Sequence, residues 1–201
     1  AEGFRPVGDE ALSAVVEDED RLPEGEDWYG AIVSGVAGAG WVSVYVADWQ
    51  DSGALARGLS ERLHAPVLEL WVAENVHWGY TYFENGQVVD RFADDPSAVA
   101  ETPAEAAEYV GKAEALASAL DAPVRDLQEA LRQARANAGR LAAGPVDALA
   151  RVAGLPFGHA FIGYESFFED DPEDYESELE GWPQFRHLTF AHPAGRESLA
   201  E

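Results

Sequence analysis

The sequence predicts an α+β fold: a mostly antiparallel sheet of order β-β-α-β-β-β, a packed antiparallel helical hairpin and a C-terminal α-β-β segment. Short apolar runs separated by glycine-containing turns occupy residues 28–96. Two apolar stripes with helical spacing occupy residues 102–143. Because strands and helices are segregated along the chain, we expect the sheet to be mostly antiparallel.

The two ends of the chain differ from this pattern. Residues 1–27 contain the run VVEDEDRLPEGED, whose charge, Pro and Gly predict a weakly ordered acidic arm. A short helix around Glu10–Val16 is an alternative within that arm. Residues 194–201 are expected to form a loose tail. We therefore expect one domain over residues 28–193.

The stretch AIVSGVAGAGWVSVYVADW predicts two strands joined at Gly38-Ala39-Gly40. In the second strand, aromatic residues fall on one face and valines on the other. Since both faces are apolar, this strand is expected to be central and covered on both sides. The aromatic residues are Trp41, Tyr45 and Trp49, and the valines are Val42, Val44 and Val46.

A helix is expected from a cap at Asp51-Ser52 to about Leu63, with a buried stripe of Leu55, Leu59 and Leu63. The run PVLELWVA is the next strand. The run VHWGYTYFENGQVVDRF predicts a β-hairpin around Asn85-Gly86, because both residues tolerate the positive φ of a type I′ turn.

The helical hairpin is predicted by two stripes on either side of Pro123. Thr102 begins the first helix with capping-box spacing to Glu105. The first stripe is Tyr109, Ala113, Leu116 and Leu120, and the second is Val124, Leu127, Leu131, Ala134, Ala138 and Leu141. After Gly144-Pro145 we expect a helix at about 145–153, a strand in GHAFIGYESFF and a last strand in QFRHLTFA.

Charge and composition exclude several functions. The net charge is −25, from 38 acidic and 13 basic residues. Such a chain is repelled by nucleic acids and by anionic membrane surfaces, so neither is an expected partner. The absence of Cys excludes thiolate metal sites and Cys nucleophiles. No run approaches the roughly 20 apolar residues of a membrane span, and a cytoplasmic location is expected.

No catalytic or metal-binding motif is found. The acidic run FFEDDPEDYESELEGW fails as a calcium loop in both registers, since Pro172 or Leu179 occupies a required position. The histidines lack zinc-ligand spacing, as the separation of His187 from His192 illustrates. VSGVAG lacks the first glycine of a nucleophile elbow. We therefore expect no metal and no cofactor.

Two groups of residues are candidates for partner binding. The acidic run interleaves carboxylates with aromatic rings, so it is a solvated loop, a partner-facing loop or a loose, weak divalent-cation site. The aromatic sheet face is either covered by the helical hairpin or open to a partner. The candidate residues are Asp170, Asp171, Glu173, Asp174, Tyr175, Trp182, Trp41, Tyr45, Trp49 and Trp71.

The sequence thus predicts a non-enzymatic, acidic interaction module for a cationic or hydrophobic protein partner. Its layout is analogous to that of bacterial immunity proteins and secretion chaperones, at the level of architecture and charge only. An enzyme or carbohydrate binder that uses the aromatic face and a nearby carboxylate such as Glu69 is the alternative. A homodimer also remains open.

Overall fold

The computed structural model describes residues 5–11, 28–37, 40–46, 51–155, 157–161, 167, 179 and 184–191. Its fold is α+β, as the sequence predicts, with two antiparallel sheets and several helices. The chain divides into two compact units. The terminal unit consists of residues 1–50 and 162–201, and the central unit consists of residues 51–161.

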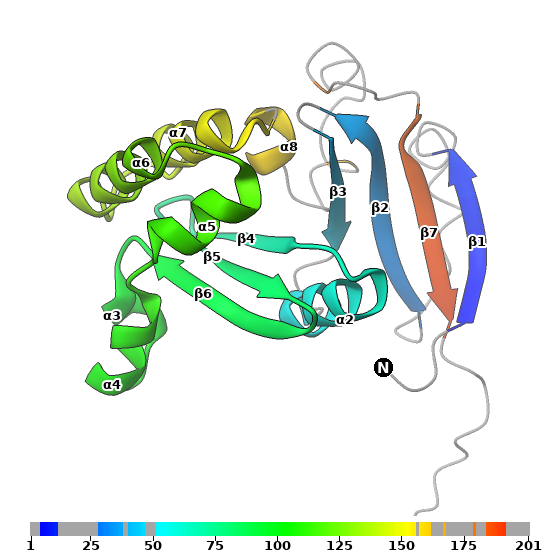
Figure 1. The fold of residues 1–201 in the computed structure, drawn as a ribbon. Coiled ribbons are helices and arrows are strands. Elements are labelled where there is room, and N and C mark those ends of the chain that lie inside the picture. The colour runs from blue at the N-terminus through cyan, green and yellow to red at the C-terminus, as the bar shows by residue number, and fades with distance from the viewer. Residues whose placement is uncertain are drawn as a thin grey trace, which may run out of the picture. The chain divides into compact units, whose positions relative to one another are not determined.

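The terminal unit contains a four-stranded sheet of order β1-β7-β2-β3 (Figure 1). Its strands are β1 (Arg5–Ala11), β2 (Trp28–Ala37), β3 (Trp41–Val46) and β7 (Arg186–Ala191). Strand β7 pairs with β1 on one side and with β2 on the other. The two ends of the chain therefore meet in one sheet, and β1 lies within the stretch expected to be a weakly ordered arm.

One face of this sheet carries the core of the terminal unit. Ile32 lies opposite Tyr45 on β3 and opposite His187 on β7, so the three side chains share a face, and all three are buried. Phe167 and Phe185 are also buried, and their rings lie 5.0 and 6.3 Å from the Tyr45 ring. The aromatic face of β3 is therefore an interior face.

The expected position of β3 was wrong. The β2–β3 pairing is confirmed and Gly40 has a positive φ of 94°, while Gly38 and Ala39 lie outside the described residues; β3 is an edge strand of the sheet and not a central one. Its valine face is open: Val42 and Val44 are 49% and 38% exposed. Valine favours strands because its branched side chain suits extended backbone, so a valine stripe alone does not indicate burial.

The central unit contains a three-stranded antiparallel sheet, β4 (Val67–Ala73), β5 (His77–Glu84) and β6 (Gln87–Ala93). The predicted hairpin is confirmed, with φ of 47° at Asn85 and 75° at Gly86. The strands expected to form one sheet are therefore divided between two sheets, one in each unit.

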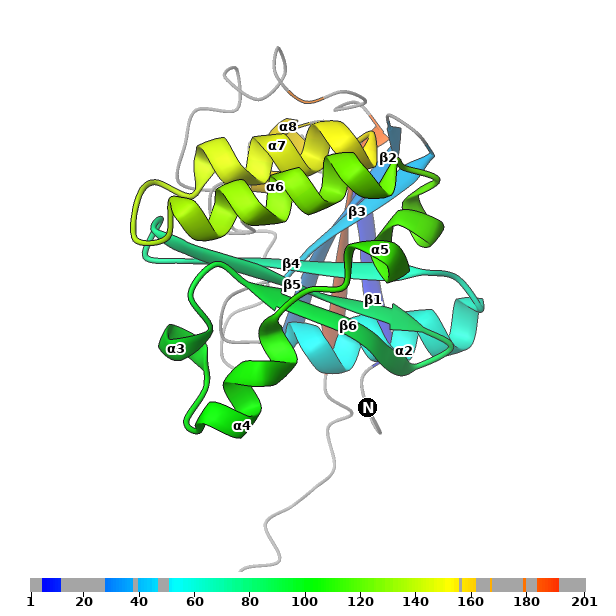
Figure 2. The ribbon, with the colours of Figure 1, turned by 60° about the vertical axis from the view of Figure 1, so that its left-hand side comes forward.

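Helices cover both faces of the central sheet (Figure 2). On one side lie α5 (Ala113–Leu120), α6 (Val124–Ala136) and α7 (Ala143–Ala153). Their buried leucines form one apolar cluster with the aromatic residues of the strands, namely Trp78, Tyr80, Tyr82 and Phe92. The helical segment therefore covers Trp78, Tyr80 and Tyr82, whereas the candidates Trp41, Tyr45 and Trp71 do not belong to this face.

Helix α2 (Ser52–Leu63) packs against the other side of the central sheet. Asp51 caps it as predicted, accepting a hydrogen bond from the Ala54 N–H at 2.8 Å. The predicted leucine stripe is only partly confirmed: Leu55 and Leu59 are half-buried, whereas Leu63 is 65% exposed. The fully buried helix residues are Ala56 and Ser60. Small residues allow close approach to the sheet, and Ser60 Oγ accepts a hydrogen bond from the Gly86 N–H.

The two helical stripes are confirmed at their centres and not at their ends. Leu116, Leu127 and Leu131 are buried as predicted. Helix α6 ends at Ala136, where the Asn137 side chain donates to the Gln133 carbonyl, so Leu141 lies beyond the helix and is 74% exposed. Val124, at the first position of α6, is also exposed.

The first predicted helix is interrupted. It consists of α4 (Pro103–Ala106), the 3-10 turn η2 (Ala107–Tyr109) and α5, with φ of 68° at Gly111 between them. Thr102 caps α4 through the Glu105 N–H, as its spacing predicts. A further short helix, α3 (Pro96–Val99), follows β6.

The strand expected in GHAFIGYESFF was wrong where the structure describes it, since Phe157–Phe161 forms the short helix α8. A short apolar run does not distinguish a helix from a strand by its periodicity. The last predicted strand is confirmed as β7. Among the described residues, no helix has the length and apolar character needed to cross a bilayer.

Candidate functional site

Most of the predicted acidic site cannot be placed. Asp170, Asp171, Glu173, Asp174, Tyr175, Trp182 and Trp49 lie outside the residues that the structure describes. The candidates that are described, Trp41, Tyr45 and Trp71, belong to β3 and β4. The described residues therefore bear only on the aromatic group of candidates.

All three described candidates are partly or wholly buried. Tyr45 packs against Phe167 and Phe185, and its burial raises the pKa of its phenol. Trp41 is half-buried on the same strand. Tyr45 is thus a core residue, and the exposed side of β3 is the valine side.

Trp71 and Glu69 lie on the side of the central sheet that α2 covers. Trp71 pairs with Gly79, where an added Cβ would lie 2.2 Å from Trp71 Cζ2, so glycine is required for the indole ring to lie against the strand. Glu69 Oε1 accepts a hydrogen bond from Ser52 Oγ at 2.6 Å, at the start of α2. Trp71 is therefore used in packing, and Glu69 in a hydrogen bond, within the central unit.

Among the described residues of the terminal unit, the exposed large apolar side chains are Val36, Val42 and Val44, which we define as the valine face. These side chains are 68%, 49% and 38% exposed. Val36 pairs with Val42 across strands β2 and β3, and Val44 pairs with half-buried Val33. The three valines thus form a continuous uncharged surface beside the free edge of β3.

The backbone of β3 has a definite orientation. The Ser43 N–H donates to Ser34 Oγ of β2 at 2.8 Å, so Ser43 directs its backbone toward β2. Peptide groups of successive strand residues alternate in direction. The N–H and C=O groups of Val42 and Val44 therefore point away from β2, toward the open edge of the sheet.

The two edges of the four-stranded sheet differ in sequence. Edge strand β1 contains Pro6, which has no N–H, an irregular register between Pro6 and Gly8, and the charged residues Asp9 and Glu10. These are the features by which proteins block unwanted strand pairing. Strand β3, WVSVYV, contains no charge, Pro or Gly. The edge role of β3 escaped sequence analysis because the pairing of β7 with β1 and β2 is long-range.

The buried carboxylate Asp90 has a structural role. Its Oδ2 accepts hydrogen bonds from the Tyr80 hydroxyl at 2.8 Å and from the Lys112 N–H at 2.7 Å, at the start of α5. Burial raises the pKa of Tyr80, and neighbouring Asp90 raises it further. This arrangement ties α5 to β5 and β6 beneath the helices.

His77, Asp94 and Asp95 form a second titratable group, at the ends of β5 and β6. His77 Nδ1 lies 3.6 Å from Asp94 Oδ1, which is too long for a hydrogen bond. The same Asp94 oxygen accepts from the Trp78 and Asp95 N–H groups at 3.2 and 2.8 Å. Hydrogen bonds from the Ser97 hydroxyl and N–H lower the pKa of Asp95. In the described part of the chain, no group of acidic and histidine side chains could hold a metal ion.

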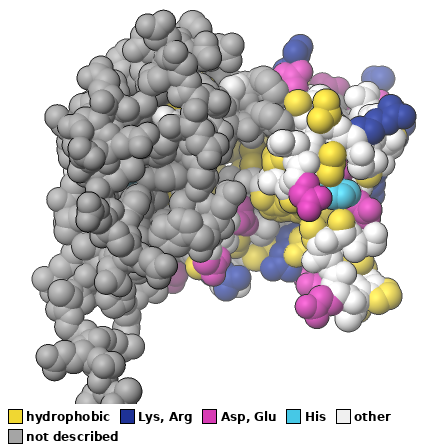
Figure 3. Space-filling view, turned by 180° about the vertical axis from the view of Figure 1, so that it is seen from behind, with side chains coloured by type: hydrophobic (Ala, Val, Ile, Leu, Met, Phe, Trp, Pro, Cys, Tyr) yellow, Lys and Arg dark blue, Asp and Glu magenta, His cyan; other side chains and the backbone are white. Residues whose placement is uncertain are grey.

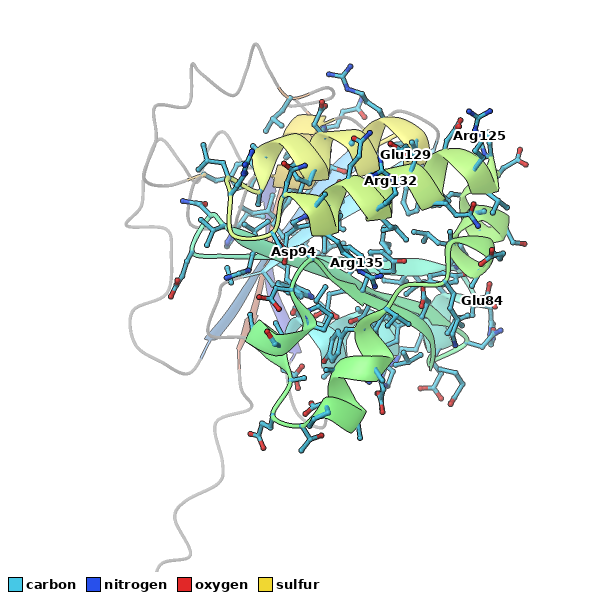
Figure 4. The ribbon with its side chains drawn as sticks, turned by 90° about the vertical axis from the view of Figure 1, so that its left-hand side faces the viewer. Glu84, Asp94, Arg125, Glu129, Arg132 and Arg135 are labelled. Atoms are coloured by element: carbon cyan, nitrogen blue, oxygen red, sulfur yellow. The ribbon has the colours of Figure 1, made fainter. Side chains whose placement is uncertain are left out.

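The outer surface of α6 carries basic residues (Figure 4). Arg132 donates two hydrogen bonds to Glu129, which lower the pKa of Glu129 to about 2. The guanidinium of Arg135 lies 5.4 Å from the centre of the Phe92 ring and donates to the Val110 carbonyl. A groove of about 270 Å³ beside Arg132 and Arg135 has Val110 and Leu131 in its lining.

Elsewhere on the central unit, charges of both signs are mixed with apolar side chains. Figure 3 shows acidic, basic and apolar groups interspersed over the described part of one face. Such a surface is typical of solvent-exposed protein. The valine face and the β3 edge are therefore the strongest candidate functional site. No protein-family model, curated protein or solved structure matches the chain.

Proposed function

We propose that this protein is a non-enzymatic interaction module that binds a basic or hydrophobic protein partner. The observation that carries the proposal is the valine face, an uncharged and exposed sheet surface in a chain of net charge −25. Exposed apolar surface on an otherwise charged protein favours a binding role. The charge favours a cationic partner and disfavours nucleic acid and anionic membranes.

The acidic run contributes to the same proposal through its charge. Residues 167–182 contain eight carboxylates and no Lys or Arg. Such a density attracts a cationic surface at close range, within a Debye length of about 8 Å at physiological salt. Asp170, Asp171, Glu173 and Asp174 would then act mainly on the rate of association. A bacterial, cytoplasmic setting belongs to the proposal as well.

An enzyme or carbohydrate binder is less well supported. Trp71 and Glu69 lie on the α2 side of the central sheet, and Glu69 is hydrogen-bonded to Ser52. Trp78, Tyr80 and Tyr82 are buried beneath α5, α6 and α7. An aromatic platform for a sugar would need rings that solvent can reach.

The proposal is tested by affinity capture from native lysate at low salt, followed by a salt gradient and by kinetic binding measurements with the purified captured protein. We expect a basic partner that elutes as salt rises. Changing Asp170, Asp171, Glu173 and Asp174 to their amides should slow its association. A matched variant at four exposed acids of the central unit, Glu61, Glu74, Glu101 and Asp121, should have a smaller effect.

Equal effects of the two quadruple variants would show that only total charge matters. Capture of proteins whose binding is insensitive to salt, and whose association rate neither variant changes, would contradict the proposal. Unfolding of the first variant would also contradict it, because the proposal places these four charges at the surface, where charges contribute little to stability.

A further inference from the structure

We infer that the free edge of β3 binds an extended, cationic segment of the partner as an added β-strand. This inference rests on the proposed function, because it names the binding site and the form of the partner. Strand addition uses main-chain hydrogen bonds for affinity and alternate side chains for specificity. Strand β3 offers both, through its outward peptide groups and through the valine face.

The peptide groups of β3 alternate in direction, and this alternation determines which main-chain groups are available to a partner. Val42 and Val44 direct their N–H and C=O groups away from β2, because the Ser43 N–H is directed toward it. In the described part of the chain, no strand lies on that side of β3. A partner strand of about six residues, or roughly 20 Å, would match the length of Trp41–Val46.

The contrast between the two edges favours binding over chance exposure. Strand β1 has Pro6, a register shift and two acidic residues, so one edge of the sheet is protected against pairing. The six residues of β3 include none of these features. An aggregation hazard of this kind is normally removed unless the edge has a partner.

The chemistry of the occupant follows from charge and side-chain shape. A second copy would bring another net charge of −25 to the edge, whereas a segment with Lys or Arg is attracted. The valine face fits branched apolar side chains from the partner strand, since such residues pair well across strands. We therefore assign the edge to a basic segment in which β-branched residues alternate with charged ones.

The test uses the full chain and a synthetic peptide of alternating lysine and valine, about ten residues long. Binding is measured by calorimetry at several salt concentrations. Two further peptides serve as controls: the same sequence with its backbone nitrogens methylated, and a glutamate–valine peptide of equal length. We expect the first peptide to bind, with affinity falling as salt rises, and both controls to bind at least roughly tenfold more weakly.

Variants of the protein test the same site from the other side. Val44→Pro removes one outward N–H and should weaken binding of the lysine–valine peptide roughly tenfold. Val72→Thr changes an exposed valine of the central unit, outside the valine face, and should have little effect. If Val44→Pro fails to fold, the methylated peptide still makes the test without changing the protein.

The outcomes separate this inference from the proposed function. If the methylated peptide, or folded Val44→Pro, binds as tightly as its unmodified counterpart, charge alone holds the peptide; strand addition is then wrong and the proposed function stands. If the glutamate–valine peptide binds as tightly as the lysine–valine peptide, the assignment of the edge to a cationic segment is wrong, and the proposed function is reduced to its hydrophobic partner. Self-association that rises with salt and is lost in Val44→Pro would assign the edge to a second copy and overturn the inference.

Discussion

The two sheets of this protein differ in how many of their apolar faces are covered. The sheet of the central unit is covered on both faces, by α2 on one side and by α5, α6 and α7 on the other. The sheet of the terminal unit buries its aromatic face and leaves a valine face exposed. Apolar residues in the central unit therefore contribute mainly to stability, and the exposed valines of the terminal unit are available for binding.

The largest expected effect of a substitution lies in the closed core of the central unit. Leu127→Ala truncates a fully buried side chain of α6 and should lower the free energy of unfolding by about 2–5 kcal/mol. Val124→Ala, three residues earlier on the same helix but exposed, is the matched control and should cost far less. Denaturant unfolding measures both, and equal losses would show that α6 is not packed as described.

The buried hydrogen bonds of Asp90 should have the next largest effect. Tyr80→Phe deletes one of the two donors to Asp90 Oδ2 and should cost about 1–3 kcal/mol, because the carboxylate stays buried. Tyr82→Phe is the control, since the Tyr82 hydroxyl donates to Glu84, which is exposed. The comparison is made by thermal and denaturant unfolding. A larger loss in Tyr82→Phe would contradict the role assigned to Asp90.

A valine of the exposed face should behave in the opposite way from a core leucine. Val44→Thr keeps the branched shape and the strand preference, so its effect on unfolding should stay within about 0.5 kcal/mol. Denaturant unfolding again provides the measurement. A cost of several kcal/mol would mean that the valine face is covered in solution, which would remove the contrast between the two sheets.

The smallest expected effect concerns the ion pair of Glu129 and Arg132 on α6. Hydrogen bonds from Arg132 lower the pKa of Glu129 from 4.5 to about 2. Because the folded-state value is depressed, the pair stabilises the protein above pH 4.5, and this contribution is lost as the pH falls through about 2. In Arg132→Gln the carboxyl titration followed by NMR should move up toward 4.5. An unchanged titration would show that the pair does not persist in solution.

Local signals in the sequence predicted most of the central unit. The Asn85-Gly86 turn, the cap at Asp51 and the burial of Leu116, Leu127 and Leu131 were all correct. Each depends on residues close together in the chain. Errors appeared where helix ends depend on tertiary contacts, as for Leu63 and Leu141, which are exposed.

The terminal unit was harder to predict because its sheet depends on long-range pairing. Strand β7 lies between β1 and β2, and no local pattern indicates which strands will be neighbours. The same limitation hid the candidate site. The sequence predicted that Val42 and Val44 share one face of the strand. Their exposure, however, depends on the position of β3 at the sheet edge.

Amide hydrogen exchange, with and without the lysine–valine peptide, tests the central claim most directly. In the free protein the amides of Val42 and Val44 should exchange quickly, because they point to an open edge, whereas those of Tyr80 and Tyr82 on central strand β5 should exchange slowly. Adding the peptide should slow exchange at Val42 and Val44 and leave the central unit unchanged. Protection of Val42 and Val44 in the free monomer, or no change on peptide binding, would contradict the account.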